Sequence, residues 1–120
     1  MRSYALRIFI SLKFITANVV DRNSGGIVAS ASTVEQSVKS AFEYGRSSSP
    51  KAAAVVGEVL AMRLKVVGLD HPELAECGIH ADVHKEIKKK GLENSAKIWA
   101  VINALRYYGV KLIIDDAPVN

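Results

Sequence analysis

The sequence predicts an α/β (α+β) fold with the element order βββααβαβ, in which helices pack on a mixed sheet. Residues 1–31 contain three short runs rich in Ile, Phe and Val with turn residues between them, which is typical of a three-stranded antiparallel meander. After residue 32, apolar residues recur mainly at helical spacing, interrupted by two further strand-like runs. With 120 residues, 49% of them hydrophobic, the chain is expected to form one domain over 1–120.

The three N-terminal strands are expected at 6–12, 14–20 and 27–31. A turn-forming cluster at 21–26, with Asp, Asn, Ser and two glycines, separates the second strand from the third. Because both connections are short, consecutive strands should pair antiparallel.

Two helices should follow the meander. Ser32 and Glu35 have capping-box spacing, in which a hydroxyl and a carboxylate each bind a free backbone N–H at a helix start, and Gly45 would end that helix. Pro50 suits the first position of a second helix, which should run to about Val67.

The middle of the chain is predicted to return to the sheet. Gly57, beside the apolar stripe of the second helix, indicates close approach of another element. A connection with one helical turn after Pro72 then leads to residues 77–84, which alternate as a half-buried strand does. The alternation assigns one face to Cys77, Ile79, Ala81 and Val83 and the other to His80, Asp82 and His84.

The C-terminal part predicts a last helix and a closing strand. The helix should begin near Asn94 or Ser95 and end at Gly109. Residues 110–114 should form the strand, and residues 115–120 a short acidic tail. The apolar side of the helix is expected to consist of Ile98, Val101, Ile102, Leu105 and Tyr108.

Cys77, His80 and His84 have the spacing of metal ligands, so a zinc site has to be considered. A structural zinc site needs four ligands that converge tetrahedrally. The predicted strand points the cysteine away from both histidines, so we expect exposed histidines beside a buried thiol and no metal or cofactor. Because Cys77 is the only cysteine, no internal disulfide can form, which suits a reducing compartment.

Asp21, Glu58, Asp82 and Asp115 raise the alternative of a metal-dependent ribonuclease of ribonuclease-H-like topology. That active site requires a carboxylate inside the first strand, where it meets the others over two magnesium ions, and the predicted first strand has none. Phosphate-loop, dinucleotide and Ser-His-Asp motifs are absent as well. We therefore predict no catalytic residue, no enzyme activity and no small-molecule substrate, with Asp21 and Asp115 in turns or at strand ends.

Basic residues are the remaining functional signal. The net charge of +4 and the pI near 9.3 permit an anionic partner without requiring one. Lys97, in the first turn of the last helix, opposes the helix macrodipole, and together with that helix start it favours a phosphate. No apolar run approaches the roughly 20 residues of a membrane span. The candidate RNA-binding residues are Arg7, Lys13, Lys85, Lys88, Lys89, Lys90 and Lys97.

The sequence resembles the universal large-subunit ribosomal protein eighteen family over about 7–112. "RIFISLKFITANVVD" is similar to the first two strands of that family, and "IVASASTVEQSV" to its third strand and helix start. "KAAAVVGEVLAMRLKVVGL" resembles its long alanine-rich helix, and "AVINALRYYGVKL" its last helix and glycine stop. The resemblance implies a non-catalytic protein that binds 5S rRNA in the central protuberance of the large ribosomal subunit, beside large-subunit rRNA and neighbouring ribosomal proteins.

The sequence departs from the family in ways that bear on function. The basic N-terminal arm of bacterial members is missing, and the first hairpin is shorter. Before the last helix the family reads roughly Phe-Asp-Arg, a few residues, then Tyr-His-Gly-Arg-Val, and only Lys97 keeps a basic position of that motif. A longer lysine-rich segment precedes Lys97. These departures indicate an organellar ribosome, a mitochondrion before a plastid, with the bacterial cytoplasm as a further alternative.

A third function class stays open beside the ribosomal protein and the nuclease. The chain could act as a scaffold that binds neighbouring proteins through an exposed sheet edge or through the tail at 115–120. Such a scaffold would bind RNA weakly and without dependence on salt.

Overall fold

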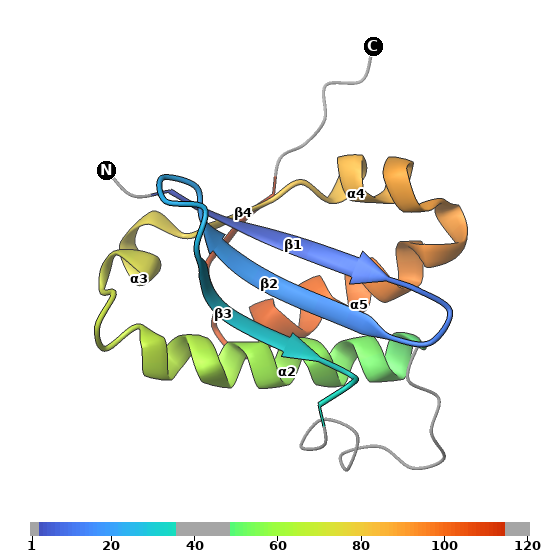
Figure 1. The fold of residues 1–120 in the computed structure, drawn as a ribbon, viewed down its shortest axis with the longest axis horizontal. Coiled ribbons are helices and arrows are strands. Elements are labelled where there is room, and N and C mark those ends of the chain that lie inside the picture. Colours follow the sequence, from blue (N-terminus) through green and yellow to red (C-terminus); the bar gives the residue numbers. More distant parts are fainter. Residues whose placement is uncertain (1–2, 36–48, 115–120) are drawn as a thin grey trace.

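The computed structural model describes residues 3–35 and 49–114 (Figure 1). In chain order these residues form β1 (Tyr4–Ile10), β2 (Ile15–Asp21), β3 (Ile27–Ser32), α2 (Pro50–Val67), α3 (Glu73–Cys77), β4 (Ile79–Ala81), α4 (Val83–Lys90), the 3₁₀ turn η1 (Leu92–Asn94), α5 (Ser95–Tyr107) and β5 (Leu112–Ile114). The helix expected between Ser32 and Gly45 lies, apart from its start, outside the described residues.

The described strands form one five-stranded sheet in the order β3-β2-β1-β4-β5. β2 pairs antiparallel with both β1 and β3, whereas β4 pairs parallel with both β1 and β5. The N-terminal meander and the mixed sheet of the predicted α+β fold are therefore confirmed.

Helices α2 and α5 pack against each other and cover one face of the sheet (Figure 1). Alternation along β1 turns Leu6 and Ile8 towards the helices and leaves Arg7 and Phe9 on the opposite face. Because those apolar side chains lie between sheet and helices, the core fills that layer. Its largest fully buried side chains are Tyr4, Ile15, Leu60, Ile79, Ile98, Ile102, Leu105, Val19, Val56, Val83 and Val101.

Helix α2 matches its predicted bounds because its end signals are local. The Ser49 hydroxyl accepts a hydrogen bond from the backbone N–H of Ala52 at 3.1 Å, Pro50 occupies the first helical position, and Gly68 follows the last residue. The close approach predicted at Gly57 is also confirmed. A Cβ at Gly57 would lie only 2.8 Å from the carbonyl oxygen of Val101 on α5.

The predicted start and end of the last helix agree with α5. It begins at Ser95, and its predicted apolar residues Ile98, Val101 and Leu105 are buried. Gly109 follows with φ 87°, a conformation that favours glycine and turns the chain towards β5.

The strand predicted over residues 77–84 was wrong except at its centre. Cys77 is the last residue of α3, and Gly78, with φ 75°, turns the chain into β4. Asp82 then caps α4, because its side chain accepts a hydrogen bond from the backbone N–H of Lys85 at 3.1 Å. Residues 77–84 therefore belong to three elements, α3, β4 and α4. The alternation of polar and apolar residues across them is a coincidence and does not mark one strand.

The first hairpin is displaced from its predicted position. β1 starts at Tyr4 and ends at Ile10, so residues 11 and 12 belong to the turn rather than to the strand. The hydroxyl of Ser11 accepts hydrogen bonds from the backbone N–H groups of Lys13 and Phe14, at 3.1 and 3.0 Å. This side chain replaces the strand pairing that the apolar pattern favoured.

The capping box predicted at Ser32 is present in part, because the Ser32 hydroxyl accepts from Val34 and not from the N–H of Glu35 that would complete the box. The backbone N–H of Ser32 donates to Oε2 of Glu35 at 3.4 Å, and the Ser32 hydroxyl accepts from the N–H of Val34 at 3.3 Å.

Candidate nucleic-acid interface

The sheet face opposite the helices presents a row of polar side chains. The register pairs Arg7 on β1 with Asn18 on β2, and Asn18 with Ser30 on β3. Residues paired across neighbouring strands lie on the same face. The cation of Arg7, which is exposed, therefore lies in line with an amide and a hydroxyl.

A second row on this face joins Phe9, Thr16 and Ser32. The hydroxyls of Thr16 and Ser32 lie 2.7 Å apart and share a hydrogen bond, while the Phe9 side chain is 49% exposed. We call these two rows the open face. Asn18, Ser30, Phe9 and Thr16 were not identified from the sequence, although the alternation of polar residues in "ITANVVD" and "IVASAS" contains the signal.

Lys13 lies in the turn between β1 and β2. It is exposed beside Leu12, whose side chain is 98% exposed. The turn therefore presents one cation and one large apolar group to a partner.

Helix α4 carries three of the predicted lysines on its exposed side. Val83 is buried, whereas Lys85, Lys88 and Lys89 are exposed. Lys88 and Lys89 lie in the last turn, where cations stabilise a helix by opposing its macrodipole. They thus have a structural role that does not depend on RNA.

Lys90 is held by its own helix. Its ammonium forms an ion pair with the carboxylate of Glu86, one turn earlier, and its side chain is only 21% exposed. Its backbone carbonyl accepts a hydrogen bond from the Asn94 side chain at 2.8 Å. Lys90 is therefore a weaker candidate for a phosphate contact than Lys88 or Lys89.

Lys97 lies in the first turn of α5 and is half-buried. The residue before this helix, Asn94, makes no side-chain cap to it, and its Nδ2 donates a hydrogen bond to the backbone carbonyl of Lys90. Lys97 therefore belongs to the helix turn whose backbone N–H groups also favour an anion, and its contact with a phosphate stays a prediction.

The fold brings most of these cations to one end of the sheet. α4 follows β4, which is parallel to β1, so α4 runs beside the second half of β1 and towards the end where the β1–β2 turn lies (Figure 1). Lys13 and the α4–α5 connection therefore occupy the same end of the molecule, and Arg7 lies on the open face behind the turn. Lys85 lies at the start of α4 and Lys90 at its end, so Lys85 is the α4 lysine farthest from Lys90.

Two of the four acidic candidates for a nuclease, Asp21 and Asp82, have local structural roles. Asp21 ends β2, and its side chain accepts a hydrogen bond from the N–H of Asn23 at 2.8 Å, which confirms its predicted position in a turn. Asp82 is the cap of α4, Glu58 lies on α2, and Asp115 is outside the described residues.

Metal ligands do not cluster in the part of the chain that the structure describes. Cys77, His80 and His84 lie on three different elements, α3, β4 and α4. The prediction that they point to opposite faces of one strand was therefore wrong. Within the same residues, none of the helices has the length and apolar character needed to cross a bilayer.

A comparison with protein families gives the identity of the fold. The model for ribosomal L18 of archaea, bacteria, mitochondria and chloroplasts matches residues 2–112. No individual curated protein matches the chain at a significant level. The matched part includes every described helix and the strands β1 to β4, and it ends at the first residue of β5. The chain therefore belongs to the ribosomal L18 family, whose members are structural proteins of the large ribosomal subunit.

Proposed function

We propose that this protein binds 5S rRNA in the central protuberance of the large ribosomal subunit, mainly through backbone phosphates. The supporting observation is the gathering of exposed cations around one end of the sheet, with the open face beside it. An electropositive surface of this kind supplies most of the affinity for nucleic acid. Membership of a ribosomal protein family supports rRNA and ribosomal proteins as partners.

Each part of the surface has its own role in this proposal. Lys13, Lys88 and Lys89 provide point charges for phosphates, without the two-pronged geometry of an arginine. Arg7 is the one arginine of the predicted set and can contact a phosphate with two N–H groups. The Asn18 amide and the Ser30 hydroxyl of the open face suit sugar and phosphate oxygens, and such contacts position a protein on RNA without reading its sequence.

Phe9 adds an aromatic ring to the proposed interface, and charged side chains alone do not provide one. An exposed aromatic ring beside cations can stack on an unpaired base, which is how many proteins hold single-stranded parts of an RNA. Its half-exposed position on the open face makes it the candidate for such a contact.

The compartment we propose is the mitochondrial ribosome. Lys97 stands where the resemblance places an arginine, and a longer lysine-rich segment precedes it, which departs from the bacterial motif. Sedimentation of the native protein with mitochondrial large subunits that contain 5S rRNA tests this placement. Sedimentation with plastid or bacterial subunits would contradict it.

The experiment for the RNA interface is the salt dependence of 5S rRNA binding. Removing one phosphate contact should lower the slope of log affinity against log salt by about one unit. The test variant replaces Lys85, Lys88 and Lys89 with alanine, and a second variant replaces Arg7 and Lys13. The matched control replaces Lys65, Arg106 and Lys111, which are also exposed but lie on α2, α5 and the segment after α5.

The outcomes separate the function classes. A lower slope for the two test variants, with the control unchanged, supports the proposal. An equal decrease for test and control would show attraction by net charge without a site. Weak binding that does not respond to salt would favour the protein scaffold, and magnesium-dependent cleavage of the RNA would favour the nuclease.

A further inference from the structure

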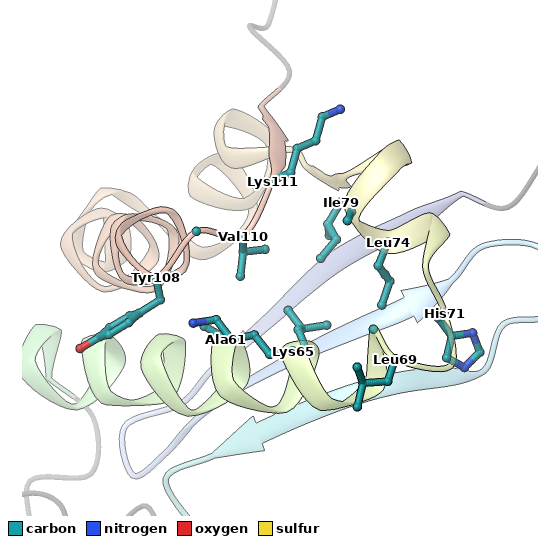
Figure 2. A pocket seen from close by; sticks show the side chains of 13 residues that line it. Ala61, Lys65, Leu69, His71, Leu74, Ile79, Tyr108, Val110 and Lys111 are labelled. Carbon is teal, nitrogen blue, oxygen red and sulfur yellow. The ribbon is translucent and has the colours of Figure 1, made fainter.

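A pocket of about 360 Å³ lies between the C-terminal half of α2, helix α3 and the connection from α5 to β5 (Figure 2). This volume is within the range of ligand pockets in proteins, roughly 300–1,000 Å³. Its walls are mainly aliphatic and come from Leu64, Leu74, Ile79 and Val110. At its edge Leu69 leaves 84% of its side chain exposed, so an apolar surface here has no cover among the described residues.

The charged side chains at this pocket have one sign. Lys65 and Lys111 line it, and among the described residues no carboxylate does. The ammonium of Lys111 donates to the neutral backbone carbonyl of Glu76 at 2.9 Å, and neither lysine forms an ion pair within the described residues. His71 also lines the pocket, with Nδ1 3.6 Å from the carboxylate of Glu73.

We infer that this pocket binds a segment of another protein in which apolar side chains are flanked by carboxylates. The aliphatic walls would bury one or two apolar side chains, and the two lysines would pair with acidic groups on either side. Burial of apolar area would supply the affinity, and the complementary charges would select the segment.

RNA is the less suitable occupant. Bases are held by stacking on aromatic or guanidinium planes and by hydrogen bonds to their edges. The phenol ring at the pocket, that of Tyr108, already packs edge to face against Tyr107, with ring centroids 5.1 Å apart. The pocket is lined in part by residues of α3, and α3 lies at the end of the molecule away from the β1–β2 turn and the α4–α5 connection (Figure 1). The protein could therefore bind RNA and this segment together.

The first test uses the labelled hexapeptide Glu-Asp-Leu-Phe-Asp-Glu and the full chain, with amide NMR shifts as the readout. At about 1 mM peptide, a concentration that detects even weak docking, shifts should move around the pocket, at 61–79 and 108–111. Two control peptides replace Leu-Phe with Ser-Gln, or every acid with lysine or arginine, and neither should move those shifts. Absence of pocket shifts with the acidic apolar peptide, or equal shifts with its basic counterpart, would overturn the inference.

Charge reversal supplies the matched variants. Lys65→Glu with Lys111→Glu should weaken binding of the acidic apolar peptide roughly three- to tenfold, because exposed ion pairs are individually weak. Lys51→Glu with Arg106→Glu changes the net charge equally on exposed residues outside the pocket and should leave the affinity unchanged. Equal weakening by both pairs would contradict a site at the pocket.

The second test uses the assembled ribosomal subunit, with a photo-crosslinking amino acid at Leu69. The inference predicts a crosslink to a protein segment that contains both carboxylates and large apolar residues. A crosslink to rRNA, to a basic segment or to nothing would overturn it. Binding to 5S rRNA should be unaffected by Lys65→Glu with Lys111→Glu, so failure of this inference and failure of the RNA proposal give different results.

Discussion

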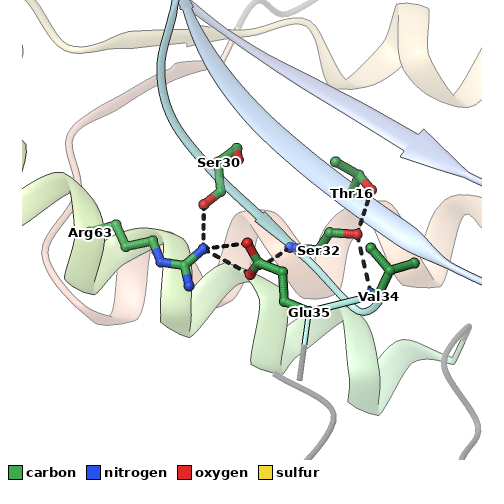
Figure 3. A network of polar contacts seen from close by, with 6 residues as sticks. All are labelled: Thr16, Ser30, Ser32, Val34, Glu35 and Arg63. Atoms are coloured by element: carbon green, nitrogen blue, oxygen red, sulfur yellow. Dashed lines mark hydrogen bonds and ion pairs between the residues drawn. The ribbon is translucent and has the colours of Figure 1, made fainter. Parts of the chain in front are cut away.

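Arg63 on α2 holds Glu35, which lies three residues beyond the end of β3 (Figure 3). Its Nη1 is 2.8 Å from Oε2 of Glu35, and the same nitrogen donates to the backbone carbonyl of Ser30 at 2.7 Å. β3 stands at the edge of the sheet, where its outer backbone groups have no neighbouring strand among the described residues. The guanidinium therefore ties the edge strand and the chain that follows it to the helix layer.

Replacing Arg63 with methionine should lower the free energy of unfolding by about 1 kcal/mol, mainly because the hydrogen bond to Ser30 is removed. The ion pair adds little, because both side chains are about one third exposed. Urea unfolding measures the change. Lys51→Met on the exposed side of the same helix is the control, and an equal effect of the two substitutions would show that the hydrogen bond and ion pair of Arg63 contribute nothing.

Gly57→Ala should destabilise the protein, although alanine favours a helix over glycine by roughly 1 kcal/mol. The new Cβ would lie 2.7 Å from the Cβ of Ala104 and 2.8 Å from the Val101 carbonyl oxygen, so α2 and α5 would have to separate. Overpacking of this kind typically costs roughly 1–3 kcal/mol. Thermal or urea unfolding gives the sign.

Ala104→Gly serves as the control for Gly57→Ala in a double-mutant cycle. It removes one of the two clashing groups, so the double variant should be destabilised by less than the sum of the two single variants. A Gly57→Ala variant that is more stable than the parent would contradict the close packing of α2 on α5.

Local signals explain which elements could be predicted from the sequence. Pro50 and Gly109 act on the backbone beside them, so the start of α2 and the end of α5 were predictable. Helix α4 was not, because His80 and His84 happened to continue the alternation of β4. The competing signals were present, namely a capping residue at Asp82 and a Glu86–Lys90 pair at helical spacing.

The sequence predicted which charged residues belong to the candidate site, but it did not predict how they are arranged in space. Whether Lys90 is available depends on its pairing with Glu86, which requires α4 to be a helix. The row from Arg7 to Ser30 depends on the register of three strands, and the parallel pairing of β1 with β4 joins segments far apart in the chain. A sequence pattern describes one segment at a time and does not contain such pairings.

Asp82→Asn should leave the stability almost unchanged, because asparagine caps a helix as well as aspartate does, whereas Asp82→Ala should cost about 1 kcal/mol. Urea unfolding of both variants tests the cap seen at the N–H of Lys85. The same two variants, Asp82→Asn and Asp82→Ala, also test the nuclease alternative. If RNA is cleaved with magnesium and Asp82→Asn abolishes the cleavage while the variant stays stable, Asp82 has a chemical role and the structural account fails.

Acid should weaken the hydrogen bond between Tyr4 and Glu73. Backbone hydrogen bonding, and then the hydroxyl of Tyr4 at 2.8 Å, hold the pKa of Glu73 below its ordinary 4.5. A carboxylate whose pKa is lower in the folded state contributes stability that is present above pH 4.5 and disappears as the pH falls through the folded value. The destabilisation caused by Tyr4→Phe should therefore be larger at about pH 6 than at about pH 3.

Urea unfolding of the parent and of Tyr4→Phe at the two pH values measures this difference. Tyr107→Phe, which removes a hydroxyl from a side chain that is 82% exposed, controls for the substitution itself. A Tyr4→Phe effect that is the same at both pH values would show that the charge of Glu73 does not strengthen the bond.

The three lysines at the end of α4 should separate into two kinds. Lys90 pairs with Glu86 in the favourable order, acid before base at a spacing of four, so Lys90→Met should lower stability by roughly 0.5 kcal/mol. It should barely change the salt slope of 5S rRNA binding, because the ammonium is already neutralised. Lys88→Met and Lys89→Met remove exposed cations and should each lower the slope by up to about one unit. A decrease in slope for Lys90→Met as large as theirs would mean that RNA draws Lys90 away from Glu86, and Glu86→Gln should then strengthen RNA binding.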